Sequence, residues 1–207
     1  MAIAFDTASG GHTATTTSLT WSHTCTGVNR ILFVGWRTGG TVTSVTYNSV
    51  AMTVITQDLG VAKVGLAYLI NPASGSNTVA INQNNAFIAG ISSSYNGVKQ
   101  TSQPDSSNTR NVSGTNSGNI STTIVAANCW TIAVAKASSS AITGGVNATV
   151  RATGDNNEHA ILDSNGPLQP GSNTMNFTSA ANAEWNEIIA SFAPFVEPQG
   201  GSTAYFM

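Results

Sequence analysis

The feature that most constrains the fold is the stretch 29–36, Asn-Arg-Ile-Leu-Phe-Val-Gly-Trp, which is the most apolar run in the chain. Its shortness and its β-branched and aromatic content favour a buried strand over a helix. Side chains alternate along a strand, so Ile31 and Phe33 face one side and Leu32 and Val34 face the other. Since both faces are apolar, this strand is expected in the middle of a sheet that is covered on each side.

Short alternating segments separated by turn residues surround this strand and predict further strands. The turn Asn48-Ser49 predicts a tight hairpin. The other expected strands are 3–7, ended by Ser9-Gly10-Gly11, and 18–24, 42–47, 50–55, 63–70, 77–82, 86–95, 120–125, 129–136, 146–153, 159–163, 172–178 and 185–195. For the last of these, the closing strand, a helix over 180–189 is the alternative.

This pattern predicts an all-β fold, an antiparallel β-sandwich with a jelly-roll-like arrangement. We expect a single β-sandwich domain over residues 1–195. The polar segment 100–119 is expected to be a long loop with one edge strand near 110–113. Residues 196–207 read as an extended C-terminal arm, a Gly- and Pro-containing linker that ends in Tyr205, Phe206 and Met207. These three apolar side chains are the predicted partner-docking residues; folding back onto the domain is the alternative.

Composition excludes several classes of function. Only 8% of the residues are charged, against about 25% in typical proteins. The seven basic residues are scattered, which argues against nucleic-acid binding. No run is long and apolar enough for a membrane span, and the first residues lack the features of a signal peptide. We therefore expect a protein that is cytoplasmic when it is made or is exported by another route.

Candidate chemical sites in the sequence are weak. Cys25 and Cys129 could pair, but two buried free thiols are the favoured interpretation. Two cysteines and three isolated histidines make a zinc site improbable. The segment 155–159, Asp-Asn-Asn-Glu-His, could offer calcium ligands from Asp155, Asn157 and Glu158, but it lacks the spacing of a known calcium loop, and a turn is the simpler interpretation.

No catalytic constellation stands out. His23 or His159 could complete a Ser-His-Asp triad, but the chain has no Gly-x-Ser-x-Gly motif. Glu184 and Glu187 are spaced so that they would not face each other along a strand. The sequence thus predicts no enzyme, no cofactor and no metal. The four tryptophans, Trp21, Trp36, Trp130 and Trp185, are expected in the core; exposed, they could stack on sugar rings.

Several segments together resemble a family of β-sandwich modules found in bacteriophage structural proteins and bacterial surface proteins. The segments that carry the resemblance are 19–24 (LTWSHT), 29–35 (NRILFVG), 45–53 (VTYNSVAMT), 66–72 (LAYLINP) and 94–100 (SYNGVKQ). The likeness extends over about residues 3–194. It implies a jelly-roll-like sandwich that functions in attachment or assembly, and it brings no catalytic residues.

The resulting hypothesis is a virion structural protein, either a capsid decoration (cement) protein or a fibre component. The expected partners are sister subunits, preferably in a homotrimer, and the major capsid protein or another virion protein. A carbohydrate-binding or adhesive module is the alternative, with glycans bound by segment 100–119 or by an exposed tryptophan. A fragment of a bacterial surface protein is a third possibility.

Overall fold

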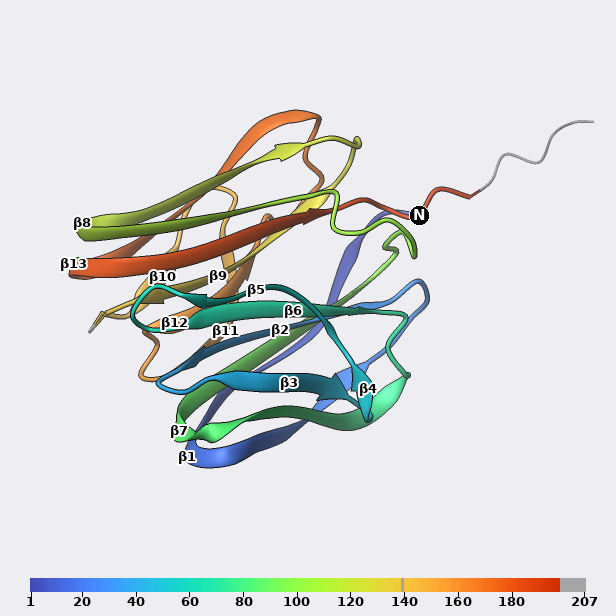
Figure 1. The fold of residues 1–207 in the computed structure, drawn as a ribbon. Coiled ribbons are helices and arrows are strands. Elements are labelled where there is room, and N and C mark those ends of the chain that lie inside the picture. The colour runs from blue at the N-terminus through green and yellow to red at the C-terminus, as the bar shows by residue number, and fades with distance from the viewer. Residues whose placement is uncertain (139, 198–207) are drawn as a thin grey trace, which may run out of the picture.

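The fold was analysed in a computed structural model that describes residues 1–138 and 140–197. The described residues form strands, turns and loops, without a helix. Two antiparallel sheets pack face to face, one in the lower and one in the upper part of Figure 1. The predicted all-β antiparallel sandwich is confirmed.

The first sheet has seven strands, which come from the first half of the chain. They are β1 (Ala4–Cys25), β2 (Ile31–Thr38), β3 (Val42–Tyr47), β4 (Val50–Ala51), β5 (Thr53–Leu59), β6 (Val64–Ile70) and β7 (Gly75–Asn96). The second sheet has six strands from the second half. They are β8 (Ser106–Ile124), β9 (Trp130–Ala137), β10 (Ile142–Gly144), β11 (Thr149–Gly154), β12 (His159–Asp163) and β13 (Gly171–Phe192).

The strand β2 has the central position that its sequence predicts. It is flanked by β6 and β7, with Phe33 opposite both Tyr68 and Ser93. Ile31 and Phe33 point into the layer between the two sheets, where they pack with residues of the second sheet. The opposite face of β2 is equally buried. The strand is therefore covered on both sides, as its two apolar faces predicted.

The two sheets repeat one pattern of strand pairing. In the first, β7 pairs with β1, β2 and β3, β2 pairs with β6, and β6 pairs with β5. In the second, β13 pairs with β8, β9 and β10, β9 pairs with β12, and β12 pairs with β11. Of the described strands, β4 alone has no counterpart. The chain is therefore an internal duplication, with one copy of the unit in each sheet.

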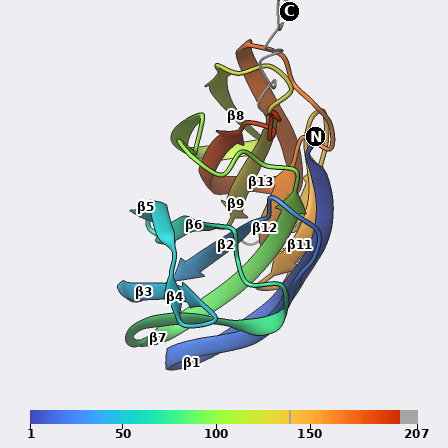
Figure 2. The same ribbon diagram turned by 90° about the vertical axis from the view of Figure 1, so that its right-hand side faces the viewer.

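Details of register and sequence support the duplication. The long last strand of each unit begins with Gly-Ser-Asn-Thr, at 75–78 and at 171–174. At the start of these strands Gly75 pairs with Cys25, and Gly171 pairs with Ile124. Figure 2 shows the long paired strands β1 and β7 as a curved ribbon along one side of the molecule.

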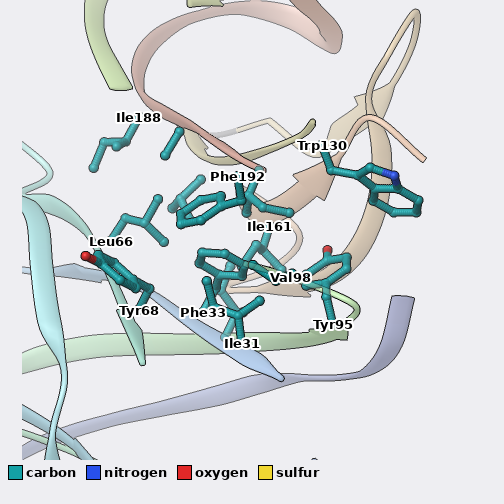
Figure 3. Packing of buried hydrophobic residues seen from close by; sticks show 14 of the residues in the cluster. Ile31, Phe33, Leu66, Tyr68, Tyr95, Val98, Trp130, Ile161, Ile188 and Phe192 are labelled. Atoms are coloured by element: carbon teal, nitrogen blue, oxygen red, sulfur yellow. The ribbon is translucent and has the colours of Figure 1, made fainter. Parts of the chain in front are cut away.

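The apolar core has three main parts. A central cluster between the sheets, seen in Figure 3, holds the aromatic rings of Phe33, Tyr95, Trp130 and Phe192. Phe33 and Phe192 come from opposite sheets, and their ring centroids lie 4.5 Å apart. Each unit also has its own cluster on the other face of its sheet, built from residues of its own strands. The units are thus joined by the central cluster.

Three expectations about segments are wrong. Residues 106–124 form the strand β8, where a long loop was expected over 100–119, because backbone pairing with β13 does not need apolar side chains. Ser9-Gly10-Gly11 does not end the first strand, since register shifts let β1 continue through it. The expected pairs of segments 77–82 and 86–95, and 172–178 and 185–195, are each one continuous strand. The favoured strand, and not the alternative helix, is found over 180–189, since these residues lie within β13.

Candidate docking surface

A hollow of the described structure lies where the chain leaves β13. It is a groove of about 580 Å³ lined by three segments, 99–101, 126–128 and 193–196, and is called the exit groove below. Figure 1 shows this end of the molecule, where the segment after β13 runs beside the N-terminus. The exit groove is therefore located at the base of the predicted C-terminal arm.

Backbone hydrogen bonds fix the wall of the exit groove that follows β13. The Phe195 N–H donates to the Gly97 carbonyl (2.7 Å), and the Lys99 N–H donates to the Ala193 carbonyl (2.9 Å). The Met1 nitrogen donates to the Phe195 carbonyl at 2.9 Å. The segment 193–196 is thereby held against residues 97–99, which leaves its other side open toward Asn128.

A second, smaller groove of about 350 Å³ shares this wall. Residues 1–3, Asn128, Trp130 and Pro167 line it together with 194–196. Apolar side chains are exposed here, with Val196 at 73% and Met1 at 60% of their full accessible area. Lys99 is the one charged side chain among the residues that line the two grooves. An apolar surface of this kind, with little charge, suits a protein or peptide partner.

The predicted docking residues Tyr205, Phe206 and Met207 lie outside the described residues. The structure describes the first two residues of the arm, Val196 and Glu197, which are exposed. The sequence predicted an apolar arm but not the apolar groove at its base. The groove is built from three segments that are distant in sequence, and no local pattern reveals their meeting.

The triad candidates form a sealed polar network. His23 is buried, and its Nδ1 lies 2.9 Å from Ser92 Oγ, which also accepts a hydrogen bond from Trp21 Nε1. Burial lowers the pKa of His23 to about 4, so its ring is neutral at physiological pH. Ser92 is fully buried as well. A substrate has no access to this serine, and the network stabilises the core.

His159 does not act as a catalytic base in this arrangement. Its side chain is completely buried, and neither ring nitrogen has a hydrogen-bond partner. Burial, together with the nearby charges of Arg37 and Lys136, lowers its pKa to about 3. A neutral, enclosed imidazole is a structural residue.

The predicted calcium ligands are engaged with other groups. Asp155 forms a salt bridge with Arg37, and Glu158 Oε2 lies 2.5 Å from Lys136 Nζ. Asn157 accepts a hydrogen bond from Thr153. Cations of the protein thus take the place of a metal ion at these carboxylates. No group of three metal-ligating side chains meets within residues 1–138 and 140–197.

Glu184 and Glu187 do not form a catalytic pair. Glu187 is buried and bonded to Arg110 at 2.8 Å, whereas Glu184 lies beside a different polar hollow with Lys136 and Glu158. Burial raises the pKa of Glu187 to about 7, despite the opposing effect of Arg110. The two carboxylates therefore lack a shared cleft.

The tryptophans and cysteines occupy core positions. Trp21, Trp36, Trp130 and Trp185 are each at most 8% exposed, which confirms the predicted core packing. Cys25 and Cys129 are free and buried, as the favoured interpretation expected. Stacking of sugars on these four indole rings would require the core to open.

In the part of the chain that the structure describes, no helix could cross a bilayer. Comparisons with protein-family models, with curated proteins and with solved structures find no match to this chain. The resemblance to phage and surface-protein modules therefore remains a hypothesis.

Proposed function

We propose that the protein is a virion structural protein, a capsid decoration or fibre component that functions by assembly with sister subunits and a virion partner. The observation that carries this proposal is the exit groove, an apolar hollow at the base of an arm that ends in Tyr205, Phe206 and Met207. Subunits can assemble when the apolar arm of one subunit binds an apolar groove on another, and this chain has both features at one end of the sandwich.

The distribution of charge supports assembly over chemistry. The buried charged side chains described in the structure are paired with partners of opposite sign, as Glu187 is with Arg110 and Asp163 with Arg151. A buried, paired carboxylate contributes to structure and is not available to a substrate. Because only 8% of the residues are charged, ion pairs can contribute little to a subunit contact, which supports a contact made through the apolar exit groove.

Glycan binding is the alternative. The sequence suggested it because of a possible loop at 100–119 and a possible exposed tryptophan, and the structure weakens both reasons. The segment 106–124 is paired along β13, and the tryptophan rings are buried. A glycan panel is the direct comparison. Saturable binding of one glycan class by the monomer would favour the adhesive module.

Light scattering after gel filtration tests the proposal. The full chain should have the mass of a trimer, and a version that ends at Glu197 should have the mass of a monomer, because the second lacks the arm. Circular dichroism of the truncated version should remain that of a β-protein, which shows that truncation has not unfolded it. A monomeric mass for both versions over a wide range of concentrations would contradict the proposal.

A further inference from the structure

We infer that the exit groove binds residues 203–207 of a neighbouring copy of this chain, with Tyr205, Phe206 and Met207 as the inserted side chains. The inference rests on the proposed assembly function and specifies its contact. The groove would accept the segment in extended form, as an added strand beside residues 193–196.

The duplication provides the main argument, because the same place in the first unit is closed. After β7, the Gly97 N–H donates to the Val28 carbonyl at 3.1 Å, and the Val98 N–H donates to the Asn29 carbonyl at 2.9 Å. These bonds join the end of the long strand to the turn before β2. The first unit thus has a continuous sheet end where the second has a groove.

The second unit does not make the equivalent bonds among its described residues. The register that pairs Ile31 with Tyr95 pairs Trp130 with Phe192, which places Pro194 in the position of Gly97. Proline has no N–H to donate. The next N–H, from Phe195, is directed to Gly97 at 2.7 Å and not to the turn 126–128. The gap between this turn and residues 193–196 is the exit groove.

The turn 126–128 is preserved although its partner is missing. Asn128 has a φ of 61°, and its counterpart Asn29 has a φ of 52°. Asp105 accepts the Val125 N–H at 2.8 Å, just as Asp6 accepts the Thr26 N–H at 2.7 Å. The turn is therefore presented in the conformation that binds an extended strand in the first unit.

The size and surface of the exit groove suit an apolar segment. Its volume of about 580 Å³ is in the range of clefts that bind ligands, roughly 300–1,000 Å³. Ala126, Ala127, Pro194 and Phe195 supply apolar contacts. In the arm, Tyr205, Phe206 and Met207 are consecutive large side chains, and no charged residue follows Glu197.

The reach of the arm allows contact with a neighbouring copy. Residues 198–207 can span at most about 33–36 Å when extended. Pro198 restricts the preceding residue, Glu197, to extended conformations, and the arm starts beside the groove that Val196 lines. That length covers most of the diameter of a domain of this size, about 40 Å.

Cross-linking tests the contact directly. One full-length variant carries Ala127→Cys in the groove, and a second, distinguished by a mass tag, carries Phe206→Cys in the arm. Cys25 and Cys129 are fully buried, so each variant has one accessible thiol. After mixing and treatment with a short bismaleimide, we expect a covalent dimer that contains one chain of each kind.

The matched control replaces Ala127→Cys by Val61→Cys, at an exposed position outside the groove. It should give several-fold less mixed dimer with the Phe206→Cys chain. A chain with both Ala127→Cys and Phe206→Cys that links only within itself would overturn the inference in favour of the arm's own groove. Equal yields for groove and control positions would also overturn it.

Failure of this contact is distinguishable from failure of the proposed function. If the arm-dependent trimer forms but the Ala127→Cys chain gives no excess of mixed dimer, assembly stands and the docking site is wrong. If the full chain is a monomer and no mixed dimer forms, both are wrong.

Discussion

Asp163 illustrates how single residues connect the two units. Its buried carboxylate accepts the Tyr95 hydroxyl from the first sheet at 2.7 Å and Arg151 Nε from β11 at 2.6 Å. The Arg151 guanidinium in turn lies 4.2 Å from the centre of the Phe5 ring in β1. The carboxylate and its charge-assisted bonds therefore extend across the interface between the sheets.

The change Asp163→Asn should destabilise the fold by about 3–5 kcal/mol, because it leaves the Arg151 charge unpaired in a largely buried place. Urea unfolding followed by tryptophan fluorescence measures the loss. Asp58→Asn is the control, since Asp58 is exposed and its positive φ suits asparagine equally well. Equal midpoints for the two variants would show that the Asp163 network contributes little.

Glu187 gives stability an unusual dependence on pH. Burial raises its pKa from about 4.5 to about 7 in the folded state, so the folded protein holds this proton when the unfolded chain has lost it. The contribution of this group to stability is thus full below pH 4.5 and is lost as pH rises toward 7. Comparison with a variant that lacks this carboxylate isolates its contribution.

Glu187→Gln isolates the effect, because glutamine is neutral at every pH. Between pH 5 and pH 8, the stability of the natural chain should fall relative to that of the variant by on the order of 3 kcal/mol. Unfolding curves of both proteins at each pH give the difference. A difference that stays constant over this range would mean that the carboxylate is already ionised at pH 5.

At the scale of elements, close contacts between strands depend on small residues. Gly65 in β6 stands opposite Trp36 in β2, and a Cβ added to Gly65 would lie 2.1 Å from two carbons of the indole ring. The indole is itself fully buried and has little room to move. The absence of a side chain at position 65 therefore allows β2 and β6 to pair around this ring.

Gly65→Ala should cost at least about 1–3 kcal/mol, as expected for overpacking a rigid core. Gly39→Ala is the matched control, because a Cβ at Gly39 would meet nothing within 4 Å. Thermal unfolding of both variants, monitored by circular dichroism, measures the difference. A Gly65→Ala variant as stable as the control would show that Trp36 can move away at small cost.

The long strand β8 makes a prediction of its own. Its backbone amides that face β13 should exchange slowly with solvent, although its side chains are mostly Ser, Thr and Asn. Hydrogen exchange measured by mass spectrometry should therefore show protection over 106–112 and 117–124. Exchange there as fast as in the turn 145–148 would mean that the segment is the loop its composition suggests.

The extent of successful prediction differs between elements for physical reasons. A strand that is buried on both faces has a continuous apolar sequence, and the bounds of β2 were therefore predicted within a few residues. An edge strand such as β8 is held by backbone bonds, so its sequence carries only a weak signal. The length of β1 was missed because bulges let a strand pass through Ser9-Gly10-Gly11.

The exit groove could not be predicted, because it depends on a single difference between the two units, Pro194 in the place of Gly97. A signal for the repeat exists in the two Gly-Ser-Asn-Thr segments at 75–78 and 171–174. Aligning the units through them brings Pro194 close to Gly97, but the three-dimensional register is needed to place the two residues together. The arm residues Tyr205, Phe206 and Met207 lie outside the described residues, so their predicted contacts remain predictions.

At the scale of the whole molecule, the central cluster makes each unit dependent on the other. Ile31, Phe33 and Tyr95 of the first unit pack against Ile188 and Phe192 of the second. A separated unit would expose this layer to water, at a cost proportional to its apolar area. The two units therefore fold as one sandwich.

Cutting the chain between the units should leave them able to reassociate. We expect fragments 1–101 and 102–197, expressed together, to purify as a one-to-one complex, because Thr101 and Ser102 are exposed and precede β8. Expressed alone, each fragment should aggregate or lack a cooperative unfolding transition. A soluble, cooperatively folded single fragment would show that the central cluster is not required.

The duplication also changes what a single substitution can do. In a symmetric dimer of identical units, every residue occurs twice, and a proline that opens one end of a sheet opens both. In this chain the two copies are encoded separately. Pro194 opens the end of the second unit while Gly97 keeps the first closed. Fusion of the copies thus gives one polypeptide a single receptive site, where a symmetric dimer of identical units would carry two.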